Sequence, residues 1–255
     1  MAARADVTLF STDFQNAAPG PYTNNAVINA GRAAGEQLNV LLGATATGTA
    51  KVEVVQFDAD RKMLAMTCPT GLGRHGFIFE VKNIFADPEQ LSIQGNNQIV
   101  GQFDIVFPFY NNMNTAEIDI MLCSGGDSTE DALMRLFLLN YGRVSFVANN
   151  RRDSGKFLAA GSSHTYRVRF YGDMGIGLDA GAFRWGFTIT EPGNKNALVH
   201  DVSDIIRSCP NRKTLAGPPD RFIIRAGYVA STPPAEPLLY FTNFHVMAYP
   251  KVRAM

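Results

Sequence analysis

The sequence predicts an all-β protein built as a β-sandwich or a barrel. Many short segments alternate apolar and polar residues, as strands with one buried face do. Clusters of Gly, Pro, Asn and Asp separate most of these segments, and few stretches have helical periodicity. Short strands at regular spacing with almost no helix are typical of sandwiches and barrels.

The first expected strands are short and lie between turn-rich segments. Residues 7–14 are interpreted as an edge strand, and 38–42 as one strand inside an otherwise loop-like stretch from 26 to 47. Further strands are expected over 51–56, 62–68, 77–81 and 91–94.

The clearest alternation is in residues 102–108 and 116–122, two strands joined by a turn. We expect Phe103, Ile118 and Ile120 to point into the core. Glu117, Asp119 and Met121 would then point outward, and we expect Asp104 to share this solvent-facing surface with the two carboxylates of the second strand. We therefore expect the functional site on this surface.

Local signals conflict over residues 127–139. Ser128 or Thr129 could cap a helix, and the Leu-rich segment that follows favours one. Asn140-Tyr-Gly142 is equally typical of a hairpin turn, and residues 143–147 alternate cleanly after it. Because the neighbouring segments are strands of similar length, we predict a hairpin.

Four strands are expected in the second half of the chain, over 166–171, 183–189, 221–226 and 239–246. Residues 191–220 are interpreted as a loop insertion, in which 201–208 could form one short helix. No linker divides the sequence, so we expect a single domain over 1–255, with 1–6 as a disordered tail.

Composition argues against two classes of partner. The chain of 255 residues has 23 basic and 23 acidic residues, so no net charge favours nucleic acid. Its apolar runs are much shorter than the roughly 18 to 20 residues that a membrane-spanning helix needs. Residues 1–6 lack the apolar core of a signal peptide, so we expect a cytosolic protein or a mature exported one, with a secreted or periplasmic location slightly favoured.

The three cysteines have no metal-ligand spacing. Cys123 ends an expected strand and is interpreted as a small buried apolar residue. Cys68 and Cys209 each precede a proline, and they could form a disulfide in an exported protein.

The order of the later strands resembles the concanavalin-like lectin and glucanase jelly roll. The resemblance covers residues 7–249 and rests on strand rhythm, including Asn-Tyr-Gly at 140–142, Tyr-Arg-Val-Arg-Phe at 166–170, Trp-Gly-Phe-Thr-Ile at 185–189 and a closing Tyr-Phe-Thr-Asn-Phe-His-Val at 240–246. It implies two antiparallel sheets, a first strand beside the last one, and carbohydrate on a concave sheet face.

Glu117-Ile-Asp119 resembles the start of the Glu-x-Asp-x-Glu or Glu-x-Asp-x-x-Glu signature of laminarinase-like glycoside hydrolases. In that family the first Glu is the nucleophile, the Asp tunes it, and the last Glu is the general acid. Met121 and Leu122 stand where that acid belongs, so the family's mechanism does not carry over. Alternate residues on a strand are about 6.6 to 6.8 Å apart, which overlaps the lower end of the carboxyl separation in inverting glycosidases. The competing interpretation is two carboxylates that are solvated or paired with arginine.

Arginines and tyrosines on neighbouring strands are candidates for substrate binding. Arg167 and Arg169 should share one face with Tyr171, and Arg135 and Arg225 hold comparable positions on other strands. Such a face suits hydrogen bonds to sugar hydroxyls or bidentate pairing with a uronate carboxylate. Internal salt bridges across the sheet would use the same residues.

A second resemblance concerns Arg225-Ala-Gly-Tyr228, which is similar to the Lys-Ala-Gly-x-Tyr stretch of jelly-roll alginate lyases. It implies proton transfer by Tyr228, but the Gln-Ile-His motif of those lyases is missing. His75, in a Gly-rich loop, is the one histidine that we consider as an acid or base near a cleft. We expect Trp185 in the core.

Similar jelly rolls often hold a structural calcium between the first and last strands, and Asp13 and Asn243 could supply oxygen ligands to one. No other cofactor is expected. We expect a protein that binds an oligo- or polysaccharide or another small polar ligand, and we rank glycan hydrolysis slightly ahead of a non-catalytic lectin. An acidic-polysaccharide lyase comes third, and a structural protein or a small-molecule enzyme stays open.

Overall fold

The computed structural model describes a sandwich of two β-sheets. The described residues are 7–21, 39–42, 51–67, 75–82, 98–108, 117–123, 126, 129, 131–138, 142–148, 150–174, 183–194, 197–208, 221–228 and 237–249. Within them, β-strands make up the regular structure apart from one 3-10 turn at Pro192–Asn194. The described part contains no helix long and apolar enough to cross a membrane.

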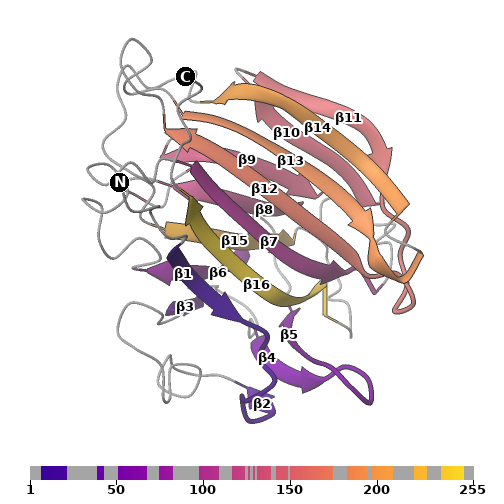
Figure 1. Cartoon of the computed structure of the whole chain (residues 1–255). Helices are drawn as coiled ribbons and strands as arrows, with labels where there is room; N and C mark the ends of the chain where they lie inside the picture. The colour runs from indigo at the N-terminus through magenta and orange to yellow at the C-terminus, as the bar shows by residue number, and fades with distance from the viewer. Residues whose placement is uncertain are drawn as a thin grey trace.

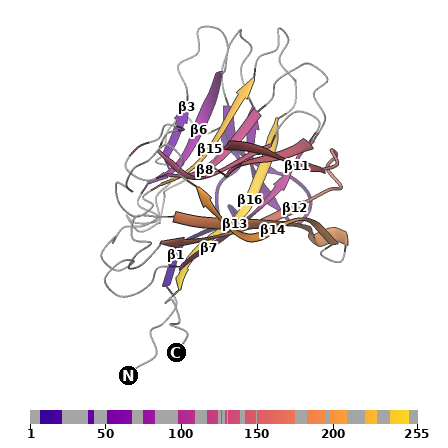
Figure 2. The same cartoon turned by 90° about the horizontal axis from the view of Figure 1, so that it is seen from above.

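The sheets lie face to face, and every strand pair is antiparallel (Figures 1 and 2). In order across the nine-stranded sheet the strands are β14 (Ala197–Ser208), β13 (Phe183–Glu191), β12 (Tyr166–Met174), β7 (Gln98–Val106), β16 (Leu239–Tyr249), β5 (Lys62–Thr67), β4 (Lys51–Gln56) and β2 (Gly20–Pro21), with β1 (Val7–Thr12) also paired to β16. In the seven-stranded sheet they are β11 (Asn150–Phe157), β10 (Arg143–Ala148), β9 (Ala132–Leu138), β8 (Glu117–Cys123), β15 (Arg221–Tyr228), β6 (His75–Lys82) and β3 (Asn39–Leu42). The all-β sandwich predicted from the sequence is confirmed.

The last strand, β16, holds the nine-stranded sheet together. One of its edges pairs with β7, and its other edge pairs with β5 near residue 240 and with β1 from Phe244 to Ala248. The prediction that the first strand lies beside the last one is therefore confirmed. Strands β3, β4 and β5 lie within the segments expected at 38–42, 51–56 and 62–68, whereas 91–94 and the tail at 1–6 lie outside the described residues.

Aromatic rings from both sheets meet in the core. Phe222 of the seven-stranded sheet contacts Phe103, Phe170 and Phe244 of the nine-stranded sheet, with ring centroids 5.8, 5.5 and 4.6 Å away. The Phe170 ring needs Gly101 on β7, because a Cβ at that position would overlap it. Trp185 is fully buried, as predicted. Dense interlocking of rings fixes how the two sheets face each other.

The conflict over residues 127–139 is resolved in favour of the hairpin. β9 and β10 are antiparallel partners, with Leu138 opposite Val144. Gly142 begins the second arm with a φ of 68°, a left-handed conformation that glycine adopts without steric cost. The prediction of a strand after Ala132 is confirmed.

The prediction of a loop insertion with a short helix is wrong for residues 197–208, because they form β14. This strand pairs along its length with β13, from Ala197 opposite Glu191 to Ser208 opposite Phe183. Pairing with an existing sheet edge outweighs the weak local preference for a helix, since tertiary context routinely overrides intrinsic propensity.

Candidate functional site

The candidate site residues divide between the two sheets. Asp104, Arg167, Arg169 and Tyr171 lie on β7 and β12 of the nine-stranded sheet. The candidates of the seven-stranded sheet, on β6, β8, β9 and β15, are His75, Glu117, Asp119, Arg135, Arg225 and Tyr228.

The prediction that Asp104 shares a surface with Glu117 and Asp119 is wrong. β7 and β8 follow each other in the chain but belong to different sheets. Phe103 and Ile118 both point into the common core, as predicted. Asp104 and Asp119 therefore lie on opposite outer faces of the sandwich, because side chains alternate along a strand.

Asp119 is paired with Arg135 on the outer face of the seven-stranded sheet. The Arg135 Nη2 donates to Asp119 Oδ1 and Oδ2 at 3.0 and 3.1 Å, and Arg135 Nε donates to Oδ1 at 3.3 Å. The guanidinium also lies over the Phe137 ring, 4.1 Å from its centroid. The two side chains are only 5% (Asp119) and 17% (Arg135) exposed. This geometry is the arginine-paired arrangement, and the expected solvent exposure of Asp119 is wrong.

An apolar cluster adjoins this ion pair along the strands. Met121, Cys123 and Ile223 form a small buried cluster on the same side of the sheet, and each is fully buried. Met121 was expected to face solvent, so this part of the expected surface is wrong as well. Cys123 is buried, as predicted, while Cys68 and Cys209 lie outside the described residues.

Strand register brings the remaining candidates of the seven-stranded sheet together. Arg225 is opposite Asp119, and Gly227 is opposite Glu117. Tyr228 is opposite His75, which lies in β6 and not in the loop expected for it. Pairing with β15 extends β6 to His75, and glycine-rich composition alone did not indicate this. The side chains of His75, Glu117, Arg225 and Tyr228 lie outside the part of the chain that the structure describes, so their roles stay predictions.

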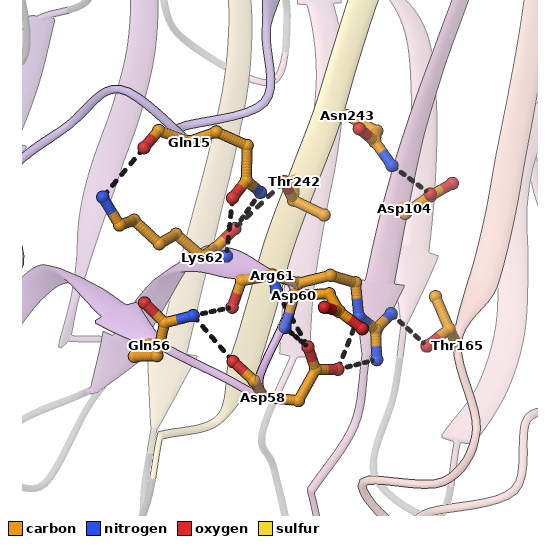
Figure 3. A network of polar contacts seen from close by, with 10 residues as sticks. All are labelled: Gln15, Gln56, Asp58, Asp60, Arg61, Lys62, Asp104, Thr165, Thr242 and Asn243. Carbon is orange, nitrogen blue, oxygen red and sulfur yellow. Dashed lines mark hydrogen bonds and ion pairs between the residues drawn. The ribbon is translucent and has the colours of Figure 1, made fainter.

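Asp104 lies at the centre of a polar cluster on the outer face of the nine-stranded sheet, and Figure 3 shows its contact with Asn243. Its Oδ1 and Oδ2 accept hydrogen bonds from Arg167 Nε and Nη2 at 2.8 and 2.9 Å. Its Oδ2 also accepts one from Asn243 Nδ2 at 2.7 Å. The hydrogen bond from Arg167 to Asp104 raises the pKa of the guanidinium, so Arg167 stays positively charged.

A bulge in β16 brings Asn243 to Asp104. Thr242 is opposite Asp104 and His245 is opposite Gln102, so Asn243 and Phe244 together face one residue of β7. Asn243 has a φ of 52°, and asparagine is one of the few residues other than glycine that tolerate this region. The bulge is a local feature that fixes the amide against the carboxylate.

Four polar side chains, here called the polar row, lie next to this cluster in register across four adjacent strands. Thr188 of β13 is opposite Arg169 of β12, Arg169 is opposite Gln102 of β7, and Gln102 is opposite His245 of β16. Arg169 is exposed, and the other three are half-buried. None of the four side chains forms a hydrogen bond or ion pair with another described residue. The polar row, together with Asp104, Arg167 and half-buried Tyr171, is called the polar face below.

The predicted calcium ligands have separate partners. Asp13 Oδ1 accepts the backbone N–H of Gln15, while Asn243 binds Asp104. Among the described residues no group of three or more His, Cys, Asp or Glu side chains could hold a metal. Calcium binding by Asp13 and Asn243 stays a prediction.

Lys62 connects the segment after β1 to β5 (Figure 3). Its Nζ donates to the carbonyl oxygens of Gln15 and Ala17 at 2.8 and 3.0 Å. Thr242 Oγ1 donates to the carbonyl of Asp13 at 2.9 Å, which fastens the same segment to β16. The Lys62 ammonium group thus donates hydrogen bonds to backbone carbonyls beside the first and last strands.

A second part of the network closes the β4–β5 hairpin. Asp58 accepts hydrogen bonds from the backbone N–H groups of Asp60 and Arg61 and from the Arg61 guanidinium. The hydrogen bond from the Arg61 side chain is the main cause that lowers the pKa of Asp58. Arg61 also donates to Thr165 Oγ1 at 3.0 Å, just before β12. These contacts connect the β4–β5 hairpin to the segment before β12.

Sequence reasoning missed Gln102, Thr188 and His245 as site residues. Alternation places Gln102 on the outward side of its strand, and the same signal applies to Thr188. Their alignment depends on which strands are neighbours and in which register, and alternation within one strand contains no information on either point.

Comparison with known proteins identifies solved structures of similar fold, but it does not assign the chain to a family. No family model and no curated protein sequence matches the chain. A conserved carbohydrate esterase from the Shiga toxin-encoding bacteriophage phi24B aligns with a TM-score of 0.53 and 12% identity, over 96% of this chain and 99% of the other. The CBM2 module of the evolved Dit of Lactobacillus casei BL23 phage J-1 aligns with a TM-score of 0.53 and 8% identity, over 98% and 99%.

Lectin II from Ulex europaeus is also similar, with a TM-score of 0.42 and 11% identity, over 83% of this chain and 97% of the lectin. The fold seen in the first two proteins spans almost the whole chain.

Proposed function

We propose that this protein is a non-catalytic carbohydrate-binding protein and that it binds glycans on the polar face of the nine-stranded sheet. The observation that carries the proposal is the polar row, in which four hydrogen-bonding side chains lie in register without a described protein partner. Adjacent strands are about 4.8 Å apart, so the row presents evenly spaced polar groups.

The chemistry of the polar row suits sugar hydroxyls. The amide of Gln102 and the hydroxyl of Thr188 both donate and accept hydrogen bonds, and the guanidinium of Arg169 donates several. A sugar hydroxyl also donates and accepts, so each of these groups can bind one. Tyr171, two residues from Arg169 on the same side of β12, adds an aromatic ring beside the row.

The carboxylates support binding more than hydrolysis. Hydrolysis of a glycoside generally needs two carboxyl groups that flank the scissile bond, one of them able to give or take a proton. Asp104 and Asp119 lie on opposite faces, and each is held by an arginine. Catalysis through Glu117 stays a prediction, and the glycan screen described below tests it with the Glu117→Gln variant.

The two proteins of similar fold support a carbohydrate ligand. One is described as a carbohydrate esterase and the other as a CBM2 module. Both align over nearly the full length of either chain, so the polar face of this chain is built on a fold that it shares with a protein described as a carbohydrate esterase.

The test is a glycan-binding screen with wild-type protein, Gln102→Ala and Lys156→Ala. Lys156 is an exposed residue of β11 in the seven-stranded sheet, so its replacement is a matched surface control. Removing the Gln102 amide should weaken glycan binding about fivefold through the loss of neutral hydrogen bonds, and the control should bind like wild type.

Two outcomes would contradict the proposal. Wild-type protein that binds no member of a broad panel of neutral, acidic and sulfated glycans would exclude carbohydrate binding. Release of sugar products that stops in Glu117→Gln would show an enzyme acting from the other sheet.

A further inference from the structure

We infer that the glycan bound by the polar face carries an oxyanion, such as a carboxylate or a sulfate, and that Arg167 and Arg169 bind it. This inference rests on the proposed function, because it concerns the ligand of the same face. The inference rests on two arginines. Arg167 is hydrogen-bonded to Asp104, and Arg169 forms no hydrogen bond or ion pair with another described residue.

Arg167 is held rigidly and still has free donors. A guanidinium has five N–H groups. Asp104 accepts one from Nε and one from Nη2, so the Nη1 group and one N–H of Nη2 take no part in this pair. The Arg167 side chain is 31% exposed, whereas Asp104 is 5% exposed. The buried carboxylate therefore orients the guanidinium, and the solvent-facing side is an edge of donors.

Arg169 adds a second cation on the same side of β12. Alternate residues of a strand are about 6.6 to 6.8 Å apart, so the two arginines flank one site along the strand. Arg169 is exposed and forms no ion pair with another described residue. A guanidinium without a protein carboxylate is well suited to bind a carboxylate or sulfate of a ligand in a bidentate manner.

The charges of the polar face leave one cation uncompensated. Asp104 neutralises Arg167, so Arg169 contributes the excess positive charge. The next acidic residue in register is Asp201 of β14, which is opposite Thr188 and hence two strands, or roughly 10 Å, from Arg169. An anionic sugar is therefore favoured over a neutral one.

The experiment measures binding of polygalacturonate, dextran sulfate and neutral dextran to wild-type protein, Arg169→Gln and Lys156→Gln. Both variants lose one positive charge, but only Arg169 lies on the polar face. We expect wild type to bind at least one of the two anionic polymers more tightly than dextran. Arg169→Gln should weaken that binding about tenfold to a hundredfold, the usual scale for a charged hydrogen bond, while Lys156→Gln stays within about twofold.

The three polymers also distinguish the ways in which the inference can fail. Binding to polygalacturonate alone would identify a carboxylate ligand, and binding to dextran sulfate alone would identify a sulfate ligand. Equal loss of affinity in both charge variants would show attraction by overall charge and overturn the inference. Binding of neutral glycans that depends on Gln102 but not on Arg169 would overturn it and leave the proposed function intact, whereas no binding to any glycan would overturn both. Thermal unfolding of each variant confirms that it is folded.

Discussion

Replacing Phe103 by alanine should lower the free energy of unfolding by about 3 to 5 kcal/mol, the usual range for removing a fully buried phenylalanine ring. Phe103 is fully buried, and its ring lies 5.5 Å from that of Phe241 and 5.8 Å from that of Phe222. Phe222 belongs to the opposite sheet, so the substitution leaves a cavity between the two layers. Urea denaturation monitored by circular dichroism measures the loss.

The matched control is Phe157→Ala, because Phe157 has the same side chain but is 58% exposed at the end of β11. Its replacement should change the free energy of unfolding by less than about 0.5 kcal/mol. Equal effects of the two substitutions would contradict the position of Phe103 between the sheets.

Asp119→Ala is the second substitution with a large expected effect, a loss of about 3 kcal/mol in the free energy of unfolding. It leaves the Arg135 guanidinium, which is only 17% exposed, without its carboxylate partner. An uncompensated buried charge typically costs about 3 to 5 kcal/mol, and the residual exposure of Arg135 places this case at the lower end. The same urea denaturation assay applies.

A double substitution separates the ion pair from the burial of an unpaired charge. Asp119→Leu combined with Arg135→Met replaces both charges by apolar groups beside Met121, Cys123 and Ile223. This protein should be about as stable as wild type or more stable, since buried ion pairs replaced by apolar residues of similar volume often lose nothing. A double variant as unstable as Asp119→Ala would show that the pair itself stabilises the sheet.

The core and most strands could be predicted from the sequence because alternation is a local property. Phe103, Ile118 and Ile120 are buried as the period of two requires. A short helix was possible at residues 201–208 because the local sequence does not reveal that they pair with the edge of β13. The hairpin at 132–148 was predicted because its turn and both arms lie within one short segment.

The candidate site could be predicted only as a set of residues. Alternation placed Asp104 and Asp119 outside the core correctly, but it does not say which sheet a strand joins. Alternation also does not indicate that the outer face around Met121 is buried, because burial there depends on other parts of the chain. Arg167 and Arg135 were predicted to bind a ligand. In the structure each forms an ion pair with a carboxylate, Arg167 with Asp104 and Arg135 with Asp119.

The measurement that tests the proposed function most directly is a titration of nitrogen-15-labelled protein with the glycan that binds most tightly in the screen, followed by NMR of backbone amides. Binding on the polar face predicts that the largest shift changes occur at Gln102, Arg169, Thr188 and their neighbours on β7, β12 and β13. Changes centred instead on Glu117, Arg135 and Arg225, in β8, β9 and β15 of the opposite sheet, would contradict it.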